Sequence, residues 1–316
     1  MVVTCLAVLA APGLTRPAGA YSWPLKPFHK PHAIRGAFDD PRFHLGAESE
    51  LSAFHFGVDI VAKDGAPVYA VEPGYVHARR TDLTVTTRTG RDFGYWHVRP
   101  VVRTGRRVRL HQLIGHVIAG WGHVHFAEAV HGSYRNPLRH GALSPYPDHT
   151  PPTVGAIRIF PSGSTSLSVT RVSSSIDIEA EVYDTPPIPP PGTWHVARLT
   201  PALIWWKLLR GNQALTDWNL SVDFSFALMP GSLYNWIYAP GTYQNKANRP
   251  GEYLFWLVHG LDTRQFPDGN YRIAVLAEDT RWNVGSGTLD FTIANGAPPI
   301  TPVLAPGMAS PFRRPV

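Results

Sequence analysis

The sequence predicts a mainly β protein made of two units, an antiparallel β domain followed by an immunoglobulin-like β-sandwich. Short apolar stretches alternate with polar residues at period two, which is the pattern of half-buried strands. Gly (28) and Pro (31) are abundant while charged residues make up 16% of the chain, a balance that suits short strands and turns better than amphipathic helices. The length of 316 residues exceeds what one ordinary core requires and fits two domains.

The chain opens with a short apolar stretch. Val2 to Ala11 is apolar, and the small residues of Ala18–Ala20 follow it. The stretch is too short to cross a bilayer, so we interpret residues 1–20 as a secretory signal, although no Lys or Arg precedes it. The competing interpretation is an apolar N-terminus with no role in export. No other stretch is apolar enough for a membrane helix, so we expect a secreted protein without a membrane span.

The cysteine count restricts the chemistry. Cys5 is the only cysteine and lies in the expected signal, so the mature chain would contain neither disulfides nor thiolate metal ligands. A metal would have to be held by His, Asp or Glu, and the chain has fifteen histidines.

Positive charge is concentrated in the first half. Residues 21–150 hold 16 Lys and Arg against 11 Asp and Glu. Outside a cell this excess favours an anionic polymer, and an ordinary solubility charge explains it equally well. We expect no nucleic-acid partner and a monomeric protein.

The first unit is expected over residues 21–143. Its strand-like segments carry no helical period, and apolar and polar residues alternate within them. The expected strands are 67–71, 74–77, 85–88, 95–98, 108–110, 115–118 and 123–127.

A stiff linker, an antiparallel sandwich and a tail are expected after the first unit. Residues 144–153 contain four prolines in ten positions, which is typical of a stiff linker. Residues 154–295 hold seven of the ten tryptophans and show period-two strands at 157–160, 176–182, 271–275 and 289–293. A hairpin-type turn is expected at 268–270. Aromatic pairs such as Trp205-Trp206 are expected to pack rather than to stack on sugars. Residues 296–316 are expected to be a disordered tail.

Three histidine segments suggest a metal site. In the first, Phe54 to Ile60, His55 and Asp59 would share one face of a strand because they are four residues apart. In the second, His123 and His125 are two residues apart and would also share a face. The third segment places His97 at the end of a strand.

Two imidazoles and a carboxylate are ligands that zinc accepts. Three protein ligands leave the fourth tetrahedral position to water, and zinc lowers the pKa of that water from about 15.7 to about 7. Hydrolysis also requires a proton-transfer group and donors for a developing oxyanion, and further histidines beside the ligands suit both tasks.

Residues 34–140 resemble the LytM/lysostaphin-type zinc endopeptidases. The resemblance depends on the order and joint presence of several short segments rather than on any one of them. These segments are 34–38 with Arg42, 55–60, 67–71, 74–76, 94–98, 105–108, 113–117, 123–126 and 136–138.

The resemblance implies roles for five residues. It places His55, Asp59 and His125 as ligands of one zinc ion, and His97 and His123 as uncoordinated catalytic histidines. It also implies a small antiparallel β fold of the hybrid-barrel type with the metal in a groove. The implied activity is hydrolysis of peptide bonds in peptidoglycan stems or cross-bridges by a cell-wall-associated enzyme.

Two departures keep alternatives open. The segments 78–83 and 119–122 differ from the family's groove-forming loops, which puts substrate preference and activity in question. One alternative is therefore a catalytically silent module that binds the wall or activates another enzyme. Another is a phosphocarrier-like barrel that uses paired histidines, against which export and Asp59 argue.

Several further residues have an ordinary structural interpretation. Glu128 is an odd number of positions from His125 and is expected to face away from the metal. His131 is a candidate for supporting the ligands. Trp96 and Trp121 either line the groove or pack beside it. His77, His111 and His116 are expected to be structural or exposed.

Overall fold

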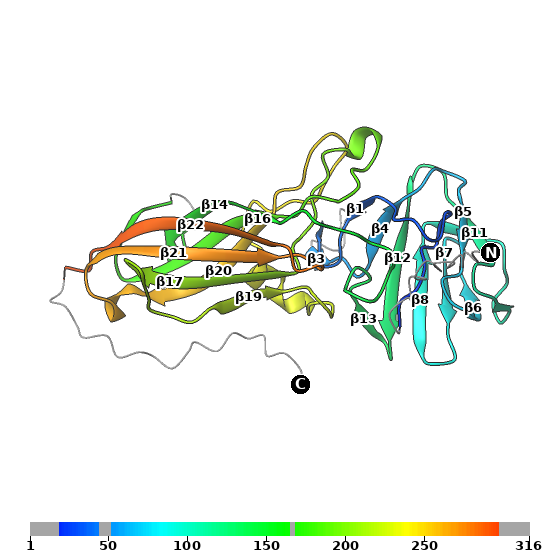
Figure 1. The fold of residues 1–316 in the computed structure, drawn as a ribbon, viewed down its shortest axis with the longest axis horizontal. Helices are drawn as coiled ribbons and strands as arrows, with labels where there is room; N and C mark the ends of the chain where they lie inside the picture. Colours follow the sequence, from blue (N-terminus) through cyan, green and yellow to red (C-terminus); the bar gives the residue numbers. More distant parts are fainter. Residues whose placement is uncertain (1–18, 44–51, 165–167, 297–316) are drawn as a thin grey trace, which may run out of the picture.

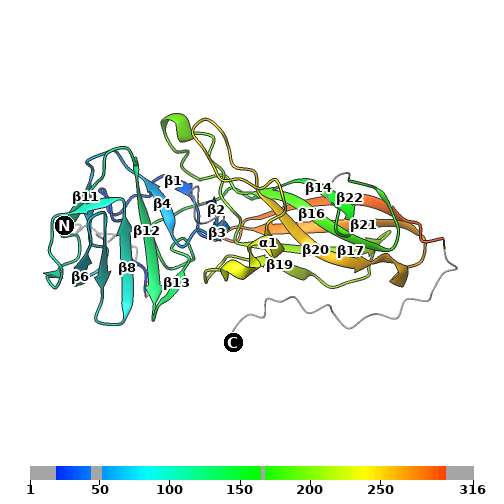
Figure 2. The same cartoon turned by 180° about the vertical axis from the view of Figure 1, so that it is seen from behind.

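The computed structural model describes residues 19–43, 52–164 and 168–296, so the expected signal and the tail beyond residue 296 lie outside it. Two β units lie end to end along the long axis of the molecule (Figures 1 and 2). In this described part, α-helix is limited to the single turn α1 (Tyr234–Ile237), accompanied by three short 3-10 turns, η1 (Gly192–Trp194), η2 (Gly231–Leu233) and η3 (Thr263–Gln265). The predicted mainly β fold class is confirmed.

The first unit contains an eight-stranded sheet, a three-stranded sheet and a two-stranded ribbon. The large sheet has the order β1–β4–β12–β8–β7–β6–β10, with β13 also paired to β12; the small sheet has the order β5–β11–β9, and β2 pairs with β3. All these pairs are antiparallel, and none of the described strands closes a barrel. The strands are β1 (Ile34–Gly36), β2 (Pro41–Phe43), β3 (Ser52–Phe54), β4 (Val58–Val61), β5 (Pro67–Tyr69), β6 (Gly74–Ala78), β7 (Asp82–Thr86), β8 (Arg91–Trp96), β9 (Val98–Pro100), β10 (Arg107–Val108), β11 (Leu113–Val117), β12 (His123–Val130) and β13 (Ser133–Arg135).

The core of this unit explains the alternation in its strands. Val58 and Ile60 of β4 and Val124 and Phe126 of β12 are fully buried in one apolar cluster, together with residues of the small sheet such as Ile114. The residues between them point to the opposite face. Burial of the apolar residues therefore determines which residues of β4 and β12 face the groove described below.

The second unit is a sandwich of two sheets. One has the order β14–β16–β20, and the other has the order β15–β22–β21–β17–β18 with β19 also paired to β17. One apolar cluster contains residues of both sheets, which is the expected sandwich packing, although the short β15 pairs parallel to β22. The strands are β14 (Thr153–Pro161), β15 (Arg171–Val172), β16 (Ser175–Tyr183), β17 (Leu203–Arg210), β18 (Gln213–Ala214), β19 (Asn219–Asp223), β20 (Leu254–Asp262), β21 (Gly269–Glu278) and β22 (Val284–Ile293).

Two local expectations are corrected. The segment 268–270 is not a hairpin turn, because β20 pairs with β16 in one sheet whereas β21 pairs with β17 and β22 in the other. The Asp268 carboxylate instead accepts the backbone N–H groups of Asn295 and Gly296. The strand expected at 85–88 lies earlier, at β7, because a turn follows it in which Thr87 bonds to Arg91.

The two units meet in a buried, hydrogen-bonded junction. Asp40 is fully buried and accepts bonds from both the backbone N–H and the hydroxyl of Thr200, at 3.1 and 2.9 Å. The Tyr238 hydroxyl donates to the Asp39 carbonyl at 2.7 Å. Phe54 of the first unit is buried in the apolar cluster of the second. These contacts fix the second unit beside the segment that carries His55.

No helix within the described ranges is long and apolar enough to span a membrane.

Candidate metal centre and groove

His55 is not held by a continuous strand, contrary to expectation. The expected strand over 54–60 is interrupted, since β3 ends at Phe54 and β4 begins at Val58. His55 lies between them, and its backbone exchanges two bonds with the turn at Asp39 and Asp40, at 2.8 and 3.0 Å. His55 therefore reaches Asp59 from a neighbouring segment rather than from the same strand face.

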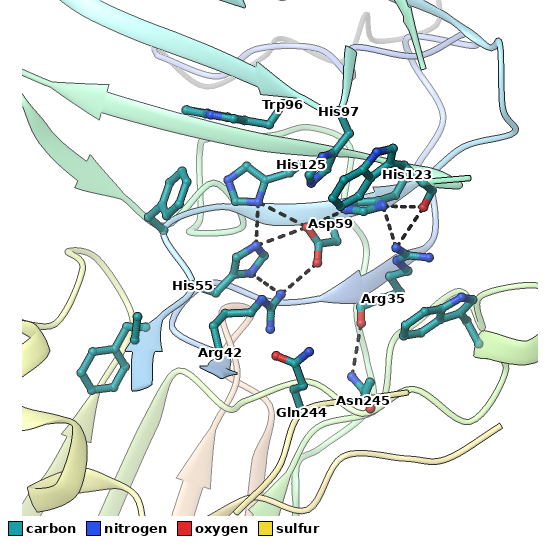
Figure 3. Close-up of a pocket in the computed structure, with 15 residues that line it drawn as sticks. Arg35, Arg42, His55, Asp59, Trp96, His97, His123, His125, Gln244 and Asn245 are labelled. Atoms are coloured by element: carbon teal, nitrogen blue, oxygen red, sulfur yellow. Dashed lines mark hydrogen bonds and ion pairs between the residues drawn. The ribbon is translucent and has the colours of Figure 1, made fainter. Parts of the chain in front are cut away.

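Asp59 and His125 face each other across two paired strands. The register of β4 and β12 pairs His125 with Asp59 and His123 with Val61. Because β12 is interior to the sheet, His125 is held on both flanks, by Asp59 of β4 and by Trp96 of β8, whereas His123 is paired with β4. His123 and His125 thus lie on the same face, as their spacing predicts (Figure 3).

Three donor atoms converge at this point. His55 Nε2 lies 2.7 Å from His125 Nδ1, and Asp59 Oδ1 lies 3.2 Å from the first and 3.3 Å from the second. A tetrahedral zinc ion with bonds of about 2.0–2.1 Å separates its ligand atoms by about 3.3 Å. The three atoms therefore have nearly the spacing that one zinc ion needs.

The contacts and protonation of the site also fit a metal. His55 Nδ1 lies 2.6 Å from the Ala37 carbonyl and 2.8 Å from Arg42 Nη2, so these contacts occupy Nδ1 and leave Nε2 to face the other two donor atoms. Burial, followed by the charge of Arg42, lowers the pKa of His55 to about 3, and burial lowers the pKa of His125. Burial alone would raise the pKa of Asp59, yet His55 and Arg42 hold it well below its ordinary value. Neutral imidazoles and an ionised carboxylate are the forms that bind metal.

Arg42 supports the carboxylate from behind. Its guanidinium donates to Asp59 Oδ2 at 2.8 Å, so the other oxygen, Oδ1, is left to face the two histidines. Gly36 makes room for this pair, because a Cβ there would lie 2.6 Å from the Arg42 guanidinium and 2.7 Å from Asp59 Oδ2. Gly57 similarly lets the chain pass close to the His125 ring.

His97 and His123 lie beside the three donor atoms. His123 Nε2 is 3.4 Å from Asp59 Oδ1, and the rings of His97 and His123 are 4.7 Å apart. His97 follows β8 with φ of 63°, a left-handed conformation that ends the strand and sends the ring toward the centre. Its ring stacks on Trp121 at 3.5 Å. Burial, followed by His123, lowers the pKa of His97 to about 3, so the ring is neutral near neutral pH.

The five residues lie in a groove with a volume of about 550 Å³, and both units line it. Trp96 and Trp121 line it too, so they contribute to the groove surface as well as to packing. Sequence reasoning had assigned no role there to Arg35 or Arg42, and it missed the contribution of the second unit. That contribution is Trp194, Gln244 and Asn245.

Other candidate residues lie elsewhere. Glu128 faces away from the centre, as expected, and is fully buried between Tyr21, Arg91 and Arg139. His131 lies at the turn after β12, next to Gly90, and does not line the groove. Trp206 is buried in the sandwich core, which bears out the expected packing of the Trp205-Trp206 pair for that residue.

A second group of three carboxylates lies at the junction, outside this groove. One ligand atom from each of Asp148, Asp184 and Asp279 lies within 4.8 Å of the others, and all three residues are buried. Burial, followed by the neighbouring Asp148 and Asp279 charges, raises the pKa of Asp184 to about 8.

No protein-family model and no curated protein matches this sequence. Solved structures that it resembles include a zinc-containing peptidase from Vibrio cholerae, at 22% identity over 37% of this chain and 39% of that one, with a TM-score of 0.31. SpoIIQ in its pore-forming complex with SpoIIIAH is 20% identical over 39% of this chain and 90% of that one, with a TM-score of 0.31. The M23 metalloprotease pseudoalterin, from the deep sea, is 14% identical over 38% of this chain and 76% of that one, with a TM-score of 0.29. At these scores, the geometry of the site carries the functional conclusion.

Proposed function

We propose that this protein is an exported zinc metalloendopeptidase that hydrolyses peptide bonds in peptidoglycan stems or cross-bridges. The observation that carries the proposal is the convergence of His55 Nε2, Asp59 Oδ1 and His125 Nδ1 within 3.3 Å of one another in an open groove. Three ligands of this type leave one zinc position free, as hydrolysis requires. The resemblance of residues 34–140 to LytM/lysostaphin peptidases supports the choice of peptidoglycan peptides.

Zinc held by these three residues would polarise the substrate carbonyl and activate a water molecule near neutral pH. The chain's own contribution is to move protons and to stabilise charge. The neutral His97 ring accepts a proton on its free nitrogen, and His123 is near enough to the same space to donate one to the leaving amine. Imidazole N–H groups on this side also stabilise the negative charge that develops on the carbonyl oxygen.

Metal content tests the centre. Elemental analysis of the purified chain is expected to give about one zinc per molecule, and His55→Ala is expected to lose it. The matched control is His29→Ala, which removes an exposed histidine outside the groove and should keep the zinc. A folded wild-type protein that takes up no zinc would refute the assignment.

Peptide cleavage tests the reaction. Purified peptidoglycan peptides are incubated with the zinc-loaded chain, and new amino termini are quantified. Loss of cleavage in folded His125→Ala is required, and cleavage retained by that variant contradicts the proposal. His97→Ala is expected to keep zinc and to lose about 10²–10⁴-fold in kcat. A chain that binds zinc and wall fragments but cuts none of them would instead be the silent binding module.

A further inference from the structure

The C-terminal unit builds one wall of the groove. The loops around η1 and around residues 240–250 project from the sandwich and stand side by side next to β1 (Figures 1 and 2). They are tied together by a bond of 2.6 Å from the Asn248 N–H to the Thr193 carbonyl. Trp194, Gln244 and Asn245 of these loops line the groove together with the candidate ligands.

Both loops converge on Arg35 of β1. The guanidinium carbon of Arg35 lies 4.1 Å from the centre of the Trp194 ring. The buried Asn245 amide donates to the Arg35 carbonyl at 3.2 Å (Figure 3) and to the Arg198 carbonyl at 2.6 Å. The second unit thus fixes the side chain of Arg35 through stacking and its backbone through a hydrogen bond.

Arg35 keeps unused donors in the groove. Its Nη2 donates to the Trp121 carbonyl at 3.1 Å and lies 2.6 Å from His123 Nδ1. In the described part of the chain, no acceptor is bonded to its Nε or Nη1, and no carboxylate forms an ion pair with it. A guanidinium that is stacked on an indole and keeps unused N–H donors is suited to pair with a carboxylate.

The charges lining the groove favour the same ligand. Arg42 is paired with Asp59 at 2.8 Å, so those two charges cancel. Arg35 is then the charged side chain lining the groove that has no ion-pair partner among the described residues. A bound zinc ion would add positive charge, so an anionic ligand is favoured over a neutral one.

Gln244 supplies a second unused group. Its amide oxygen is buried at the groove and has no hydrogen-bond partner among the described residues. Burying such an acceptor unpaired is costly.

We propose that the C-terminal unit makes the groove a receptor for acidic peptides, in which Trp194 positions Arg35 to pair with a carboxylate side chain of the bound peptide. The inference rests on the proposed function only in taking the ligand to be a peptide.

The test compares two blocked pentapeptides, Gly-Gly-Glu-Gly-Gly and Gly-Gly-Gln-Gly-Gly, which differ only in one charge. Binding of each to the metal-free full chain is measured by tryptophan fluorescence at low salt. The wild type is expected to bind the Glu peptide at least about tenfold more tightly, which is the effect of one charge-assisted hydrogen bond. The preference should fall as salt screens the pair. Equal binding of both peptides by the wild type overturns the proposal.

Variants assign the preference to its residues. Arg35→Ala should bind both peptides equally, and Arg35→Lys should retain only part of the preference, because it keeps the charge without the planar group that stacks on Trp194. Trp194→Ala should reduce the preference at least about threefold, whereas Trp194→Phe, which keeps a ring, should retain most of it. The matched control is Trp218→Ala, which removes another tryptophan stacked on a cation, Lys207 at 4.5 Å, outside the groove. An undiminished preference in Arg35→Ala overturns the proposal.

Cleavage of the same peptides separates the two proposals. If the zinc-loaded chain prefers the Glu peptide in binding but cuts neither peptide nor any wall peptide, the acidic-peptide receptor stands and the peptidase fails. If it cuts both peptides with equal KM and binds them equally, the peptidase stands and the receptor is overturned.

Discussion

Arg42 acts on the candidate centre from outside the ligand set. Its guanidinium binds Asp59 Oδ2 and lies 3.7 Å from the buried carboxylate of Asp40. The carboxylate of Asp59 is therefore held in one orientation before any metal arrives. Such supporting contacts set metal affinity because a ligand that must reorient pays for it in binding free energy.

Replacing Arg42 is expected to weaken zinc binding without removing a ligand. Arg42→Ala should raise the zinc dissociation constant about 10–100-fold, as loss of a supporting contact commonly does. Competition with a chromophoric chelator measures the constant. Arg42→Lys keeps the charge but not the planar guanidinium, so its zinc dissociation constant should lie between those of Arg42→Ala and the wild type. An unchanged constant in folded Arg42→Ala would mean that Asp59 is positioned by other contacts.

At the scale of residues, the sequence predicted what local spacing controls. His123 and His125 share a face because the period of a strand is two, and β12 extends through both. Arg35 and Arg42 carry no comparable signal, since their roles depend on partners such as Trp194 and Asp59 that are distant in the chain. Trp194 is one of several tryptophans in a strand-rich half, and nothing in its neighbourhood marks it as a groove residue.

At the scale of elements, β12 carries two different buried polar sites. Its groove face holds His123 and His125, and further along the strand Glu128 is fully buried against Tyr21, Arg91 and Arg139. Burial alone would raise the pKa of Glu128, but the bonds from Arg139 and the neighbouring charges hold it below its ordinary value. The carboxylate thus forms ion pairs with two arginines and ties β8 and the segment after β13 to β12.

Breaking this cluster is expected to lower stability without loss of bound zinc. Glu128→Gln leaves Arg139 without a carboxylate and Arg91 with Glu72 alone, and it should lower the free energy of unfolding by about 3–5 kcal/mol. Urea denaturation measures the loss, and elemental analysis should still find zinc. Asp290→Asn is the matched control, since it breaks an exposed pair with Arg272 and should have no measurable effect. A folded Glu128→Gln protein that has lost its zinc would contradict this separation of the two sites.

The strands themselves were predictable where one face is buried and the other is not. Residues 176–182 and 271–275 lie within β16 and β21, because burial against the facing sheet imposes period two. Sheet assignment was not predictable: the turn at 268–270 has hairpin residues, yet it joins strands of opposite sheets. The break between β3 and β4 was missed for the same reason, since it depends on the bonds of His55 with Asp39 and Asp40 rather than on local propensity.

At the scale of the whole molecule, the carboxylates of Asp148, Asp184 and Asp279 make the junction sensitive to pH. Asp184 titrates near pH 8 in the folded chain and near its ordinary value of 3.8 when unfolded. Between these values the folded state binds more protons, so the stabilising contribution is complete below about pH 4 and is lost as pH rises toward 8.

Replacing Asp184 with its neutral analogue should remove this pH dependence. Asp184→Asn is expected to match the wild type at about pH 4 or below and to exceed its Tm by at least about 3 °C at pH 8.5. Calorimetry at the two pH values measures the difference. Asp217→Asn, which changes an exposed carboxylate of the same unit, should show no such divergence. A constant difference between Asp184→Asn and the wild type across this range would rule out the buried charge as its cause.

The junction also links the sandwich to the candidate metal centre through Phe54. This ring lies 5.3 Å from Tyr234, 5.8 Å from Tyr238 and 5.9 Å from Phe224 of the second unit, and the next residue in the chain is His55. The second unit therefore anchors the segment that presents a candidate ligand. Because a ligand whose backbone is loosened must be ordered on binding, the sandwich should contribute to zinc affinity as well as to the groove wall.

Phe54→Ala tests this long-range coupling. The cavity should cost about 3–5 kcal/mol of unfolding free energy, and the zinc dissociation constant should rise at least about tenfold. Denaturation and chelator competition give the two quantities on the same protein.

Phe291→Ala is the matched control. It removes a buried ring of the sandwich core, in β22, that contacts Tyr271 rather than the junction. It should lower stability by a similar amount and leave zinc affinity unchanged. If both variants bind zinc equally well, the sandwich does not position His55, and its role at the groove is confined to the wall formed by Trp194, Gln244 and Asn245.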